Sequence, residues 1–484
     1  MIANTKKTKI VCTIGPATSS VERLSDLLKA GMNIVRLNFS HGDFAEHQEK
    51  LVNLKTAIKQ TGIPCATLQD LAGPKIRIGT FKTESVMLKE GAFFTLTTDK
   101  IEGDETRVSI NYAPLPKEVK VGGYIMLHDG KKRLQIVEIK GNDVKCKIII
   151  GGEIKGKRGV NLPGAYLSIS SLTDKDKTDI AFGLKNKVDF FAFSFVRRAS
   201  DVEELRAILK TAKSDAKIIA KIEDQEAIEN IDKLIELVDG VMIGRGDLAI
   251  EIGAENMPIT QKMIIDKCNQ AGKPVITATQ MFESMIKSAT PTRAEVSDVA
   301  NAIFEGTDAV MLSEETTLGE YPVQAVTMMA LVAKTTEAGI AKEHEAMWET
   351  SGMVESIGAS AVKVAHDIRA KAIFVLTNSG KSVFMVSKNK PNLPIIGMTA
   401  SVRTANQLLL SYACTPILVP KMLTMVEVSK QVREIVKKYK IAEKGDRVVV
   451  VAGMPLGKVA ETSAILVEAD FTRRGRGRLR RGRR

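Results

Sequence analysis

Eight short β-rich runs separated by helical stretches are the feature that most limits how this chain can fold. Most neighbouring runs are separated by 12–20 residues in which apolar side chains recur at i, i+3 and i+4, the spacing of an amphipathic helix. Strands that alternate with helices form parallel sheets, and eight of them predict a closed (β/α)8 TIM barrel rather than an open sheet. The runs are 9–15, 33–40, 65–70, 189–195, 217–223, 240–247, 274–279 and 309–315.

The alternation is interrupted once and later gives way to a second pattern. Between the third and fourth runs, short strands and glycine turns predict a small inserted β-barrel domain that acts as a lid. After residue 340, helices alternate with strands again, which predicts a C-terminal α/β regulatory domain with an open sheet. The expected domains are the barrel (1–70 and 168–340), the lid (71–167), the C-terminal domain (341–471) and a basic Arg/Gly tail (472–484).

Composition excludes several classes of protein. With 44% apolar and 26% charged residues, the chain is neither disordered nor of low complexity. The sequence has no run near the ~20 apolar residues that cross a membrane, and its start lacks the apolar stretch of a secretory signal. Its five scattered cysteines form no disulfide framework or CxxC metal motif. We therefore expect a cytoplasmic protein without membrane spans.

The net charge of +13 raises the question of a nucleic-acid partner. Eight of these charges are arginines in the last thirteen residues, so the other 471 residues carry only +5. The tail is interrupted by glycines and is expected to be disordered. It could bind RNA or anionic lipid through phosphates, or it could be solvated without a partner. Nucleic acid is therefore not expected as a partner except through the tail.

Polar side chains gather at the C-terminal ends of the predicted barrel strands, where such barrels place their chemistry. Alternate residues of a strand share a face, so Arg36, Asn38 and Ser40 form one row, and Lys221 and Glu223 form another. A cation, an amide and a hydroxyl opposite a lysine and a carboxylate predict a site for an anion and a metal. The alternative is a set of lumen residues that only neutralise one another.

Glu223 and Asp247 end neighbouring predicted strands, so their carboxylates can converge on one cation. Two carboxylates without a nearby His or Cys suit Mg²⁺ or Mn²⁺ better than zinc. The turn at 244–248 (GRGDL) exposes backbone N–H groups before a short helix, which favours an anionic substrate group such as a carboxylate.

Lys221 is open to two chemical interpretations. A lysine beside a metal and an arginine fits the stabilisation of a transferring phosphoryl group. It could also form a Schiff base with a carbonyl substrate. The neighbouring carboxylate keeps a lysine protonated, which favours the phosphoryl role.

The motifs RLNFSHG (36–42), GPKIRIG (73–79), GVNLPG (159–164), IIAKIEDQEAIEN (218–230), GRGDLAIEIG (244–253), TATQMFESM (277–285) and PTRAEVSDVANAIFEGTDAVMLSEET (291–316) resemble those of the pyruvate kinase family. They follow the family's order along nearly the whole chain. The resemblance implies transfer of a phosphoryl group from phosphoenolpyruvate to ADP, giving pyruvate and ATP in the last step of glycolysis. It also implies the barrel, the lid, the C-terminal domain and a homotetramer.

The resemblance also implies roles for individual residues. The divalent metal ligands are Glu223 and Asp247, and Lys221 and Arg36 contact the phosphoryl group. The implied substrate contacts are Gly246, Asp247 and Thr279, the proton delivery group comprises Thr279 and Ser313, and the nucleotide contacts are Asn38, His41, Arg77 and Arg158.

The implied site for a monovalent cation departs from the family pattern. Its ligands are Asn38, Ser40, Asp70 and the carbonyl of Leu71. Many potassium-dependent members read TKGPE at this segment, whereas this chain reads LAGPK and places Lys75 at the position of the glutamate. A tethered ammonium competes with a bound K⁺ by charge repulsion. We expect an enzyme that works without potassium; the alternative is that Lys75 points to solvent and K⁺ still binds.

A second candidate site follows the predicted strand 372–377. A strand, a Gly/Ser turn with a lysine and a helix start form a cradle for phosphate. This pattern predicts an effector site for a sugar phosphate or a nucleotide, and an ordinary strand–helix connection is the alternative. Its residues are Thr377, Ser379, Gly380, Lys381 and Ser382.

Two other functions remain open from the sequence. A metal-dependent lyase that forms an enolate and cleaves a carbon–carbon bond could use the same carboxylates, but it does not account for GVNLPG or the RLNFSHG row. An RNA-binding or scaffold protein could act through its tail, although aromatic residues are only 5% of the chain and scattered.

Overall fold

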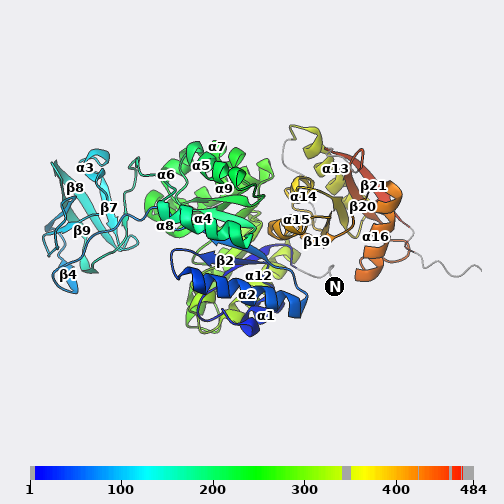
Figure 1. Ribbon diagram of the computed structural model, residues 1–484, viewed down its shortest axis with the longest axis horizontal. Helices are drawn as coiled ribbons and strands as arrows, with labels where there is room; N and C mark the ends of the chain where they lie inside the picture. The colour runs from blue at the N-terminus through cyan, green and yellow to red at the C-terminus, as the bar shows by residue number, and fades with distance from the viewer. Residues whose placement is uncertain (1–5, 341–349, 423, 457–460, 470, 472–484) are drawn as a thin grey trace, which may run out of the picture. The chain divides into compact units, whose positions relative to one another are not determined.

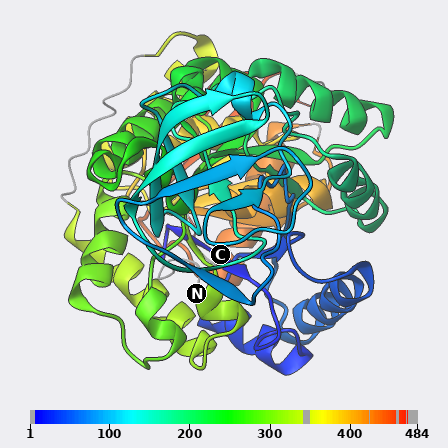
Figure 2. The same cartoon turned by 90° about the vertical axis from the view of Figure 1, so that its left-hand side faces the viewer.

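A computed structural model of the chain describes residues 6–340, 350–422, 424–456, 461–469 and 471. The predicted barrel is confirmed, because eight parallel strands close in the order β1-β16-β15-β14-β13-β12-β3-β2. The helices lie outside this ring of strands (Figures 1 and 2). The strands are β1 (Lys9–Thr13), β2 (Ile34–Asn38), β3 (Ala66–Asp70), β12 (Phe190–Phe193), β13 (Lys217–Ile222), β14 (Gly240–Gly244), β15 (Val275–Ala278) and β16 (Ala309–Leu312).

Local sequence fixes where several barrel helices begin. Ser20 and Asp43 cap the first turns of α1 and α2, and Thr173 and Thr292 form capping boxes with acids three residues later. The helices are α1 (Val21–Ala30), α2 (Phe44–Thr61), α4 (Asp174–Asn186), α5 (Ala199–Thr211), α6 (Gln225–Glu229), α7 (Ile231–Leu237), α8 (Arg245–Ile252), α9 (Met257–Ala271), α10 (Arg293–Phe304), α11 (Glu314–Thr317) and α12 (Pro322–Gly339).

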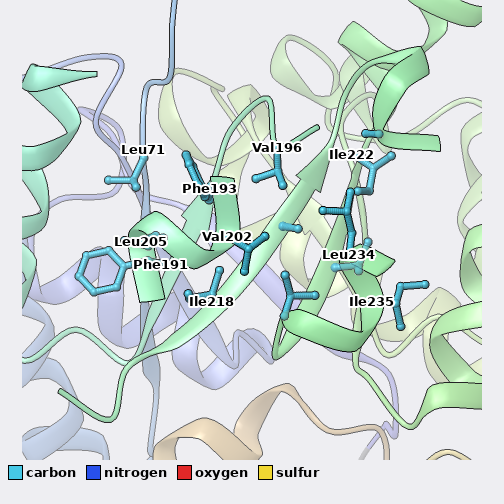
Figure 3. Packing of buried hydrophobic residues seen from close by; sticks show 14 of the residues in the cluster. Leu71, Phe191, Phe193, Val196, Val202, Leu205, Ile218, Ile222, Leu234 and Ile235 are labelled. Carbon is cyan, nitrogen blue, oxygen red and sulfur yellow. The ribbon is translucent and has the colours of Figure 1, made fainter. Parts of the chain in front are cut away.

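The layer between strands and helices is apolar and decides which strand residues face inward. Ile218, Ala220 and Ile222 of β13 pack with Phe191 and Phe193 of β12 in one cluster (Figure 3). Full burial of such side chains stabilises the fold by roughly 1.5–3 kcal/mol each. Because alternate residues face opposite sides, this packing turns Lys221 toward the inside of the barrel.

The segment between β3 and α4 forms two further sheets around its own apolar cluster, which includes Phe94, Ile125 and Leu134. A six-stranded sheet has the order β11-β7-β8-β9-β5-β6, and β10 pairs with β4. A lid function for this segment and the expected domain boundaries stay predictions. Its elements are β4 (Ser85–Leu88), β5 (Phe93–Thr97), β6 (Arg107–Ser109), α3 (Leu115–Glu118), β7 (Tyr124–Leu127), β8 (Lys132–Lys140), β9 (Asp143–Ile150), β10 (Gly152–Lys155) and β11 (Val160–Asn161).

The chain divides into two compact units, Ile10–Met329 and a second unit made of Met1–Lys9 and Ala330–Arg484. The second unit contains the predicted open sheet, with the strand order β19-β18-β17-β20-β21. Its edge strand β21 is antiparallel to β20, whereas the other pairs are parallel. The elements are α13 (Met353–Asp367), β17 (Ile373–Leu376), α14 (Lys381–Ser387), β18 (Ile395–Thr399), α15 (Val402–Gln407), β19 (Cys414–Leu418), α16 (Met425–Tyr439), β20 (Val448–Gly453) and β21 (Thr462–Glu468).

The basic tail expected at 472–484 lies outside the described residues. Among the helices that the structure describes, none is long and apolar enough to span a membrane.

Candidate active site

Strand register brings the predicted polar rows together at the C-terminal ends of β2, β3 and β13. Asn38 lies opposite Asp70 in the pairing of β2 with β3. The Nε atom of Arg36 donates to Oδ2 of Asp70 at 2.6 Å, and its Nη1 atom donates to the hydroxyl of Thr13 at 2.8 Å. Arg36 is 9% exposed and Asp70 only 1%, so this ion pair is buried.

Lys221 lies between two carboxylates and a hydroxyl. Its Nζ atom is 2.9 Å from Oε1 of Glu223 and 3.3 Å from Oδ1 of Asp70, and it donates to the Ser194 hydroxyl at 2.7 Å. Ser194 in turn donates to the carbonyl of Leu71 at 2.6 Å. The ammonium is thereby held at one place by groups from three strand ends.

Sequence reasoning missed Ser194 and Thr13 as parts of this cluster. Both are buried and end or follow barrel strands, so the rule that found Arg36 could have found them. Ser194 is the first polar residue after the apolar run 190–193. This position at a strand end was the signal that could have found it.

Opposite charges in this cluster stabilise the ionised forms of Lys221 and Asp70. Burial alone would lower the pKa of Lys221, but the charges of Asp70 and Glu223 outweigh burial and raise it. Burial would raise the pKa of Asp70, but Lys221 and Arg36 outweigh it and lower that pKa. Both groups therefore favour the ionised form near neutral pH, which disfavours a Schiff base at Lys221 because only the neutral amine is a nucleophile.

Glu223 is positioned from both sides by backbone. Its Oε2 atom accepts a hydrogen bond from the N–H of Phe195 at 2.9 Å. Its side chain crosses so close to Gly244 that a Cβ atom there would lie 2.6 Å from Cγ of Glu223. The glycine that precedes the Arg245-Gly246-Asp247 turn therefore makes room for this carboxylate.

Asp247 completes a pair of acids that suits a divalent cation. Burial, followed by the negative charge of Glu223, raises the pKa of Asp247 to about 6. This destabilisation of the charged form is what a bound cation would relieve. Glu223 and Asp247 could together supply two oxygen ligands to such a cation. Among the described residues, no group of three or more His, Cys, Asp or Glu side chains is placed to hold a metal.

Two more acids lie in the electrostatic surroundings of this pair. Burial is the main reason that the pKa of Asp224 rises to about 7 and that of Glu251 to about 8, and the charge of Asp224 adds to the rise at Glu251. Asp224 also caps α6 by accepting from the N–H of Ala227 at 2.8 Å. The site thus disfavours further negative charge unless a cation is present.

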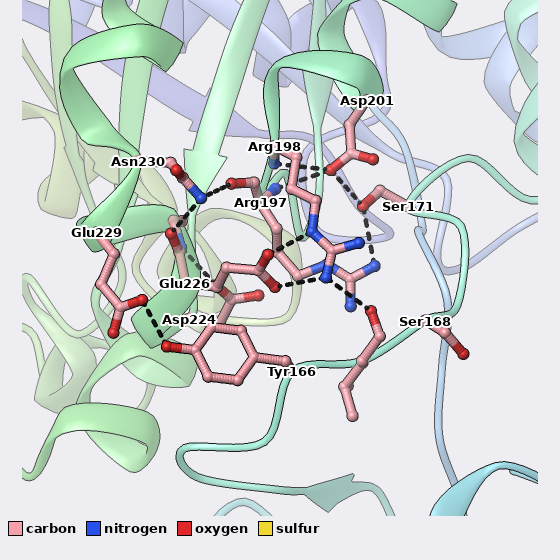
Figure 4. A network of polar contacts seen from close by, with 12 residues as sticks. Tyr166, Ser168, Ser171, Arg197, Arg198, Asp201, Asp224, Glu226, Glu229 and Asn230 are labelled. Atoms are coloured by element: carbon pink, nitrogen blue, oxygen red, sulfur yellow. Dashed lines mark hydrogen bonds and ion pairs between the residues drawn. The ribbon is translucent and has the colours of Figure 1, made fainter. Parts of the chain in front are cut away.

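A polar network beside Asp224 ties the return from the inserted segment to the barrel (Figure 4). Arg198 pairs with Glu226, and Tyr166 donates to Glu229 at 2.8 Å. Asp201 accepts from the backbone N–H of Arg197 at 2.9 Å and from Arg198 at 3.0 Å. These contacts fix the loop that follows β13, on which Glu223 lies.

Thr279 and Gly246 lie in contact, because the N–H of Gly246 donates to the Thr279 hydroxyl at 3.1 Å. Thr279 and Gln280 both have positive φ, 67° and 53°, which is uncommon for residues with side chains. Arg245 holds this strained turn: its guanidinium donates to the carbonyl oxygens of Ala278, Thr279 and Gln280 at 2.6–3.3 Å. Asp298 accepts from the same guanidinium at 2.9 Å.

Ser313 follows β16 at the same end of the barrel. Its N–H donates to Oε2 of the buried Glu315 at 2.7 Å, and Oε1 of that carboxylate accepts from the N–H of Phe282 at 3.1 Å. Glu315 therefore ties the loop after β15 to the loop after β16, which carry Thr279 and Ser313.

The RLNFSHG turn is held by its own side chains and by α2. The side-chain oxygen of Asn38 accepts from the N–H of Ser40 at 3.0 Å. Burial and then the charges of Lys75, Arg36 and Arg77 lower the pKa of His41. Basic side chains therefore lie near this turn. His47 stacks on Phe39 and its Nε2 atom contacts the carbonyl of His41 at 3.0 Å.

We expect His47 to make stability depend on pH. It is 2% exposed, its Nδ1 atom has no hydrogen-bond partner among the described residues, and burial, aided by Lys50, lowers its pKa from 6.5 to about 4. The stabilisation is complete above pH 6.5 and is lost as pH falls toward 4, by on the order of 2 kcal/mol. Urea unfolding of the wild type and of His47→Gln at several pH values measures this. Equal pH slopes in the two proteins would contradict it.

The other predicted nucleotide contacts lie in the inserted segment. Arg77 forms an isolated antiparallel bridge with Gly159, so Arg77 and Arg158 lie on adjacent stretches of backbone. Arg77 is exposed. Arg158 is half-buried, and its Nε atom has no partner among the described residues.

Lys75 is half-buried and lies within the electrostatic range of the site. Burial lowers its pKa first, and Arg77 and Lys221 lower it further, whereas Asp70 acts in the opposite direction. The ammonium group therefore interacts with the carboxylate that was predicted to bind a monovalent cation.

The predicted effector loop connects β17 to α14. The N–H of Gly380 donates to the Thr377 hydroxyl at 2.9 Å, and Gly380 adopts a φ of 92°, which favours glycine. Ser382 and Thr462 share a hydrogen bond of 2.5 Å. Thr377 and Ser382 thus form hydrogen bonds with other residues of the second unit. The binding of a ligand by this loop remains a prediction.

Comparisons with known proteins match most of the chain to one family. A family model described as pyruvate kinase, barrel domain, matches residues 5–326, and one described as pyruvate kinase, alpha/beta domain, matches residues 355–468. Pyruvate kinase of Geobacillus stearothermophilus is 42% identical over 98% of this chain and 82% of its own length. That of Clostridium perfringens is also 42% identical, over 96% and 99%. A crystal structure of a pyruvate kinase from Cryptosporidium parvum has a TM-score of 0.92 at 36% identity and covers 97% of both chains.

Proposed function

Because the chain belongs to the pyruvate kinase family, we propose that the residues at the mouth of its barrel transfer the phosphoryl group of phosphoenolpyruvate to ADP. The family makes the protein a phosphotransferase that forms pyruvate and ATP in glycolysis. The observation that supports the site most directly is Lys221, a buried ammonium held between Asp70 and Glu223.

Lys221 and Arg36 are the two cations proposed to bind the transferring phosphoryl group. Charge spreads over the oxygens of that group during transfer, and fixed cations in a buried site stabilise it without reorganising. Lys221 is held ready by Ser194, and Arg36 by Thr13 and Asp70. The phosphates of ADP would be bound by four other residues, Asn38, His41, Arg77 and Arg158.

The substrate carboxylate is proposed to lie at the N-terminus of α8. The N–H of Gly246 and the hydroxyl of Thr279 are both hydrogen-bonding groups at this point. After transfer the enolate needs a proton, and Thr279 and Ser313 are the hydroxyls proposed to deliver it through water.

A divalent metal fits this site, since Glu223 and Asp247 are hard oxygen ligands and the pKa of Asp247 is raised by burial and by Glu223. Mg²⁺ is the proposed ion, with Mn²⁺ as the alternative. When bound, it would neutralise charge on the substrate oxygens. Of the two ligands, Glu223 would be held in place by the N–H of Phe195, and Gly244 leaves room for its side chain.

We expect turnover without potassium. The ammonium of Lys75 shares the field of Asp70, where a monovalent cation would otherwise be bound. Turnover of the wild type in potassium-free Tris buffer should match turnover with K⁺, while Lys75→Glu should fall at least tenfold without K⁺ and recover when it is added. A tenfold change in turnover corresponds to about 1.4 kcal/mol. The interaction energy of two unit charges about 4 Å apart near a protein surface is larger than this.

Lys82→Glu is the matched control, because Lys82 is an exposed lysine in the inserted segment. Its turnover should be insensitive to K⁺. A wild-type enzyme that stops in potassium-free buffer would contradict the assignment of Lys75.

Arg245 is expected to be a positioning residue for Thr279. Arg245→Lys retains a charge for Asp298 but loses the fork that holds three carbonyl oxygens of a positive-φ turn. A displacement of about 1 Å at such a site costs on the order of 10²-fold in turnover. Steady-state kinetics should show that kcat falls and KM for phosphoenolpyruvate rises, with the fold intact by circular dichroism.

Arg206→Lys provides the comparison, because Arg206 likewise bonds a carboxylate and a carbonyl, those of Asp239 and Leu237. Its kinetics should be normal. If the two variants behaved alike, Arg245 would have only a structural role.

The remaining expectations are proposals about partners and regulation. A sugar phosphate or nucleotide effector would bind at the loop after β17, the protein would be a cytoplasmic homotetramer, and the inserted segment would act as a lid. Light scattering tests the tetramer, and calorimetric titration with fructose bisphosphate or AMP tests the effector site. A coupled assay of pyruvate formation tests the main activity, and nothing in the comparisons favours the lyase or scaffold alternatives.

A further inference from the structure

Asn161 is a polar side chain of the inserted segment that points away from the apolar cluster of that segment. Its neighbours Val160 and Leu162 are 7% and 3% exposed and both pack in that cluster. Because successive side chains of a strand point to opposite sides, Asn161 on β11 points the other way. It is nevertheless half-buried. Residues outside the cluster therefore cover it.

Two acids of α8 lie opposite this side chain. Asp247 and Glu251 are four residues apart on the helix and so share one face of it. The side chain of Asn161 hydrogen-bonds to both carboxylates, and Glu251 also accepts from the backbone N–H of Leu162. A side-chain amide has two N–H donors, so a single asparagine can serve two acids. These hydrogen bonds favour the charged form of each acid and oppose the burial that raises both pKa values.

The backbone that carries Asn161 is itself held against α8. Asn161 pairs with Met126 of β7 in an antiparallel ladder. The turn that follows β7 also reaches the helix, because a Cβ atom added to Gly130 would lie 3.3 Å from Cγ1 of Ile250. The inserted segment thus meets α8 at two points, and a paired strand brings Asn161 to Asp247.

We propose that Asn161 is a positioning residue for Asp247, so that a side chain of the inserted segment completes the metal site of the barrel. This inference rests on the proposed function, in which Glu223 and Asp247 bind the divalent cation. A hydrogen bond to one carboxylate oxygen fixes the orientation of the ligand and leaves the other oxygen for the ion. Glu223 receives the corresponding hydrogen bond from the N–H of Phe195. Metal binding and the contact of the inserted segment with α8 then stabilise each other, because both favour the same position of Asp247.

Electron paramagnetic resonance titration of the full-length protein with Mn²⁺ tests this proposal without reference to activity. Asn161→Ala should weaken Mn²⁺ binding by about 10- to 100-fold, the range for loss of a contact that supports a metal ligand. Asn161→Leu keeps a side chain of similar size without N–H groups and should lose as much affinity. Hydrogen exchange of the backbone amides at 159–164 should slow on addition of Mg²⁺ in the wild type and in neither variant. Circular dichroism checks that both variants are folded.

Asn142→Ala is the matched control, because Asn142 also lies in the inserted segment and donates its amide to a carboxylate, that of Asp99, at 2.8 Å. Its Mn²⁺ affinity and its exchange response should equal those of the wild type. If Asp247→Asn bound Mn²⁺ like the wild type, the proposed metal site itself would be wrong. If Asp247→Asn lost binding while Asn161→Leu kept it, or if Asn142→Ala lost as much affinity as Asn161→Ala, only the role of Asn161 would be wrong.

Discussion

Lys221→Met should lower the turnover of phosphoenolpyruvate and ADP by roughly 10³-fold or more, since a fixed cation at a migrating phosphoryl group contributes several kcal/mol in the transition state. Methionine has a similar length and keeps the apolar stem packed in the barrel. It removes the charge that Asp70 and Glu223 surround at 3.3 and 2.9 Å. The loss should lie in kcat, because Lys221 acts mainly on the charge that develops during transfer.

Two measurements separate this effect from damage to the fold. Removing one member of a buried ion cluster leaves unpaired carboxylates, so stability should fall by a few kcal/mol while the fold remains. Lys217→Met is the matched control, because Lys217 lies at the other end of the same strand and pairs with Asp239. It should retain turnover within a few-fold. Wild-type turnover in Lys221→Met would refute the assigned role.

Glu223→Gln should abolish most metal binding and most turnover together. The amide keeps the contact to Phe195 possible but removes one of the two negative charges offered to the cation. Loss of a contact that supports a ligand weakens metal binding by up to about a hundredfold. Loss of the ligand itself should weaken Mn²⁺ binding by at least that factor. Electron paramagnetic resonance titration with Mn²⁺ measures this without reference to activity.

Asp247→Asn should act in the same direction. Glu236→Gln is the control, because Glu236 is an exposed carboxylate on α7. Its Mn²⁺ affinity should match that of the wild type. If Glu223→Gln bound Mn²⁺ normally, the two-carboxylate site would be wrong, even if turnover had fallen.

The barrel could be predicted from the sequence because its signals are local. Hydrophobic alternation in runs such as 217–223 and helical spacing in stretches such as 19–31 are properties of neighbouring residues. The same rule placed Arg36 and Asn38 on one face and Lys221 and Glu223 on another. The polar ends of these strands were sufficient to predict a site for an anion and a metal.

The partners within the site could not be predicted in the same way. Ser194 donates to Leu71 and receives from Lys221 only because β12 lies between β3 and β13 in the closed barrel. From the sequence, no role was assigned to Arg245, whereas in the structure its guanidinium donates to the carbonyl oxygen of Thr279. Such contacts depend on strand order and register, which no short window of sequence contains.

The sequence by itself determined the strands, the helices and the chemical types of side chain at the barrel mouth, because these follow from the periodicity of the backbone and from side-chain chemistry. Only the tertiary structure decided which charged groups lie in contact, such as Lys221 with Glu223 at 2.9 Å and with Asp70 at 3.3 Å. It buried Lys221, Asp70 and Glu223 together, and the neighbouring charges raise the pKa of Lys221 and lower the pKa of Asp70 against the effect of burial. Residues more than 150 positions apart act as one site only after the barrel has closed.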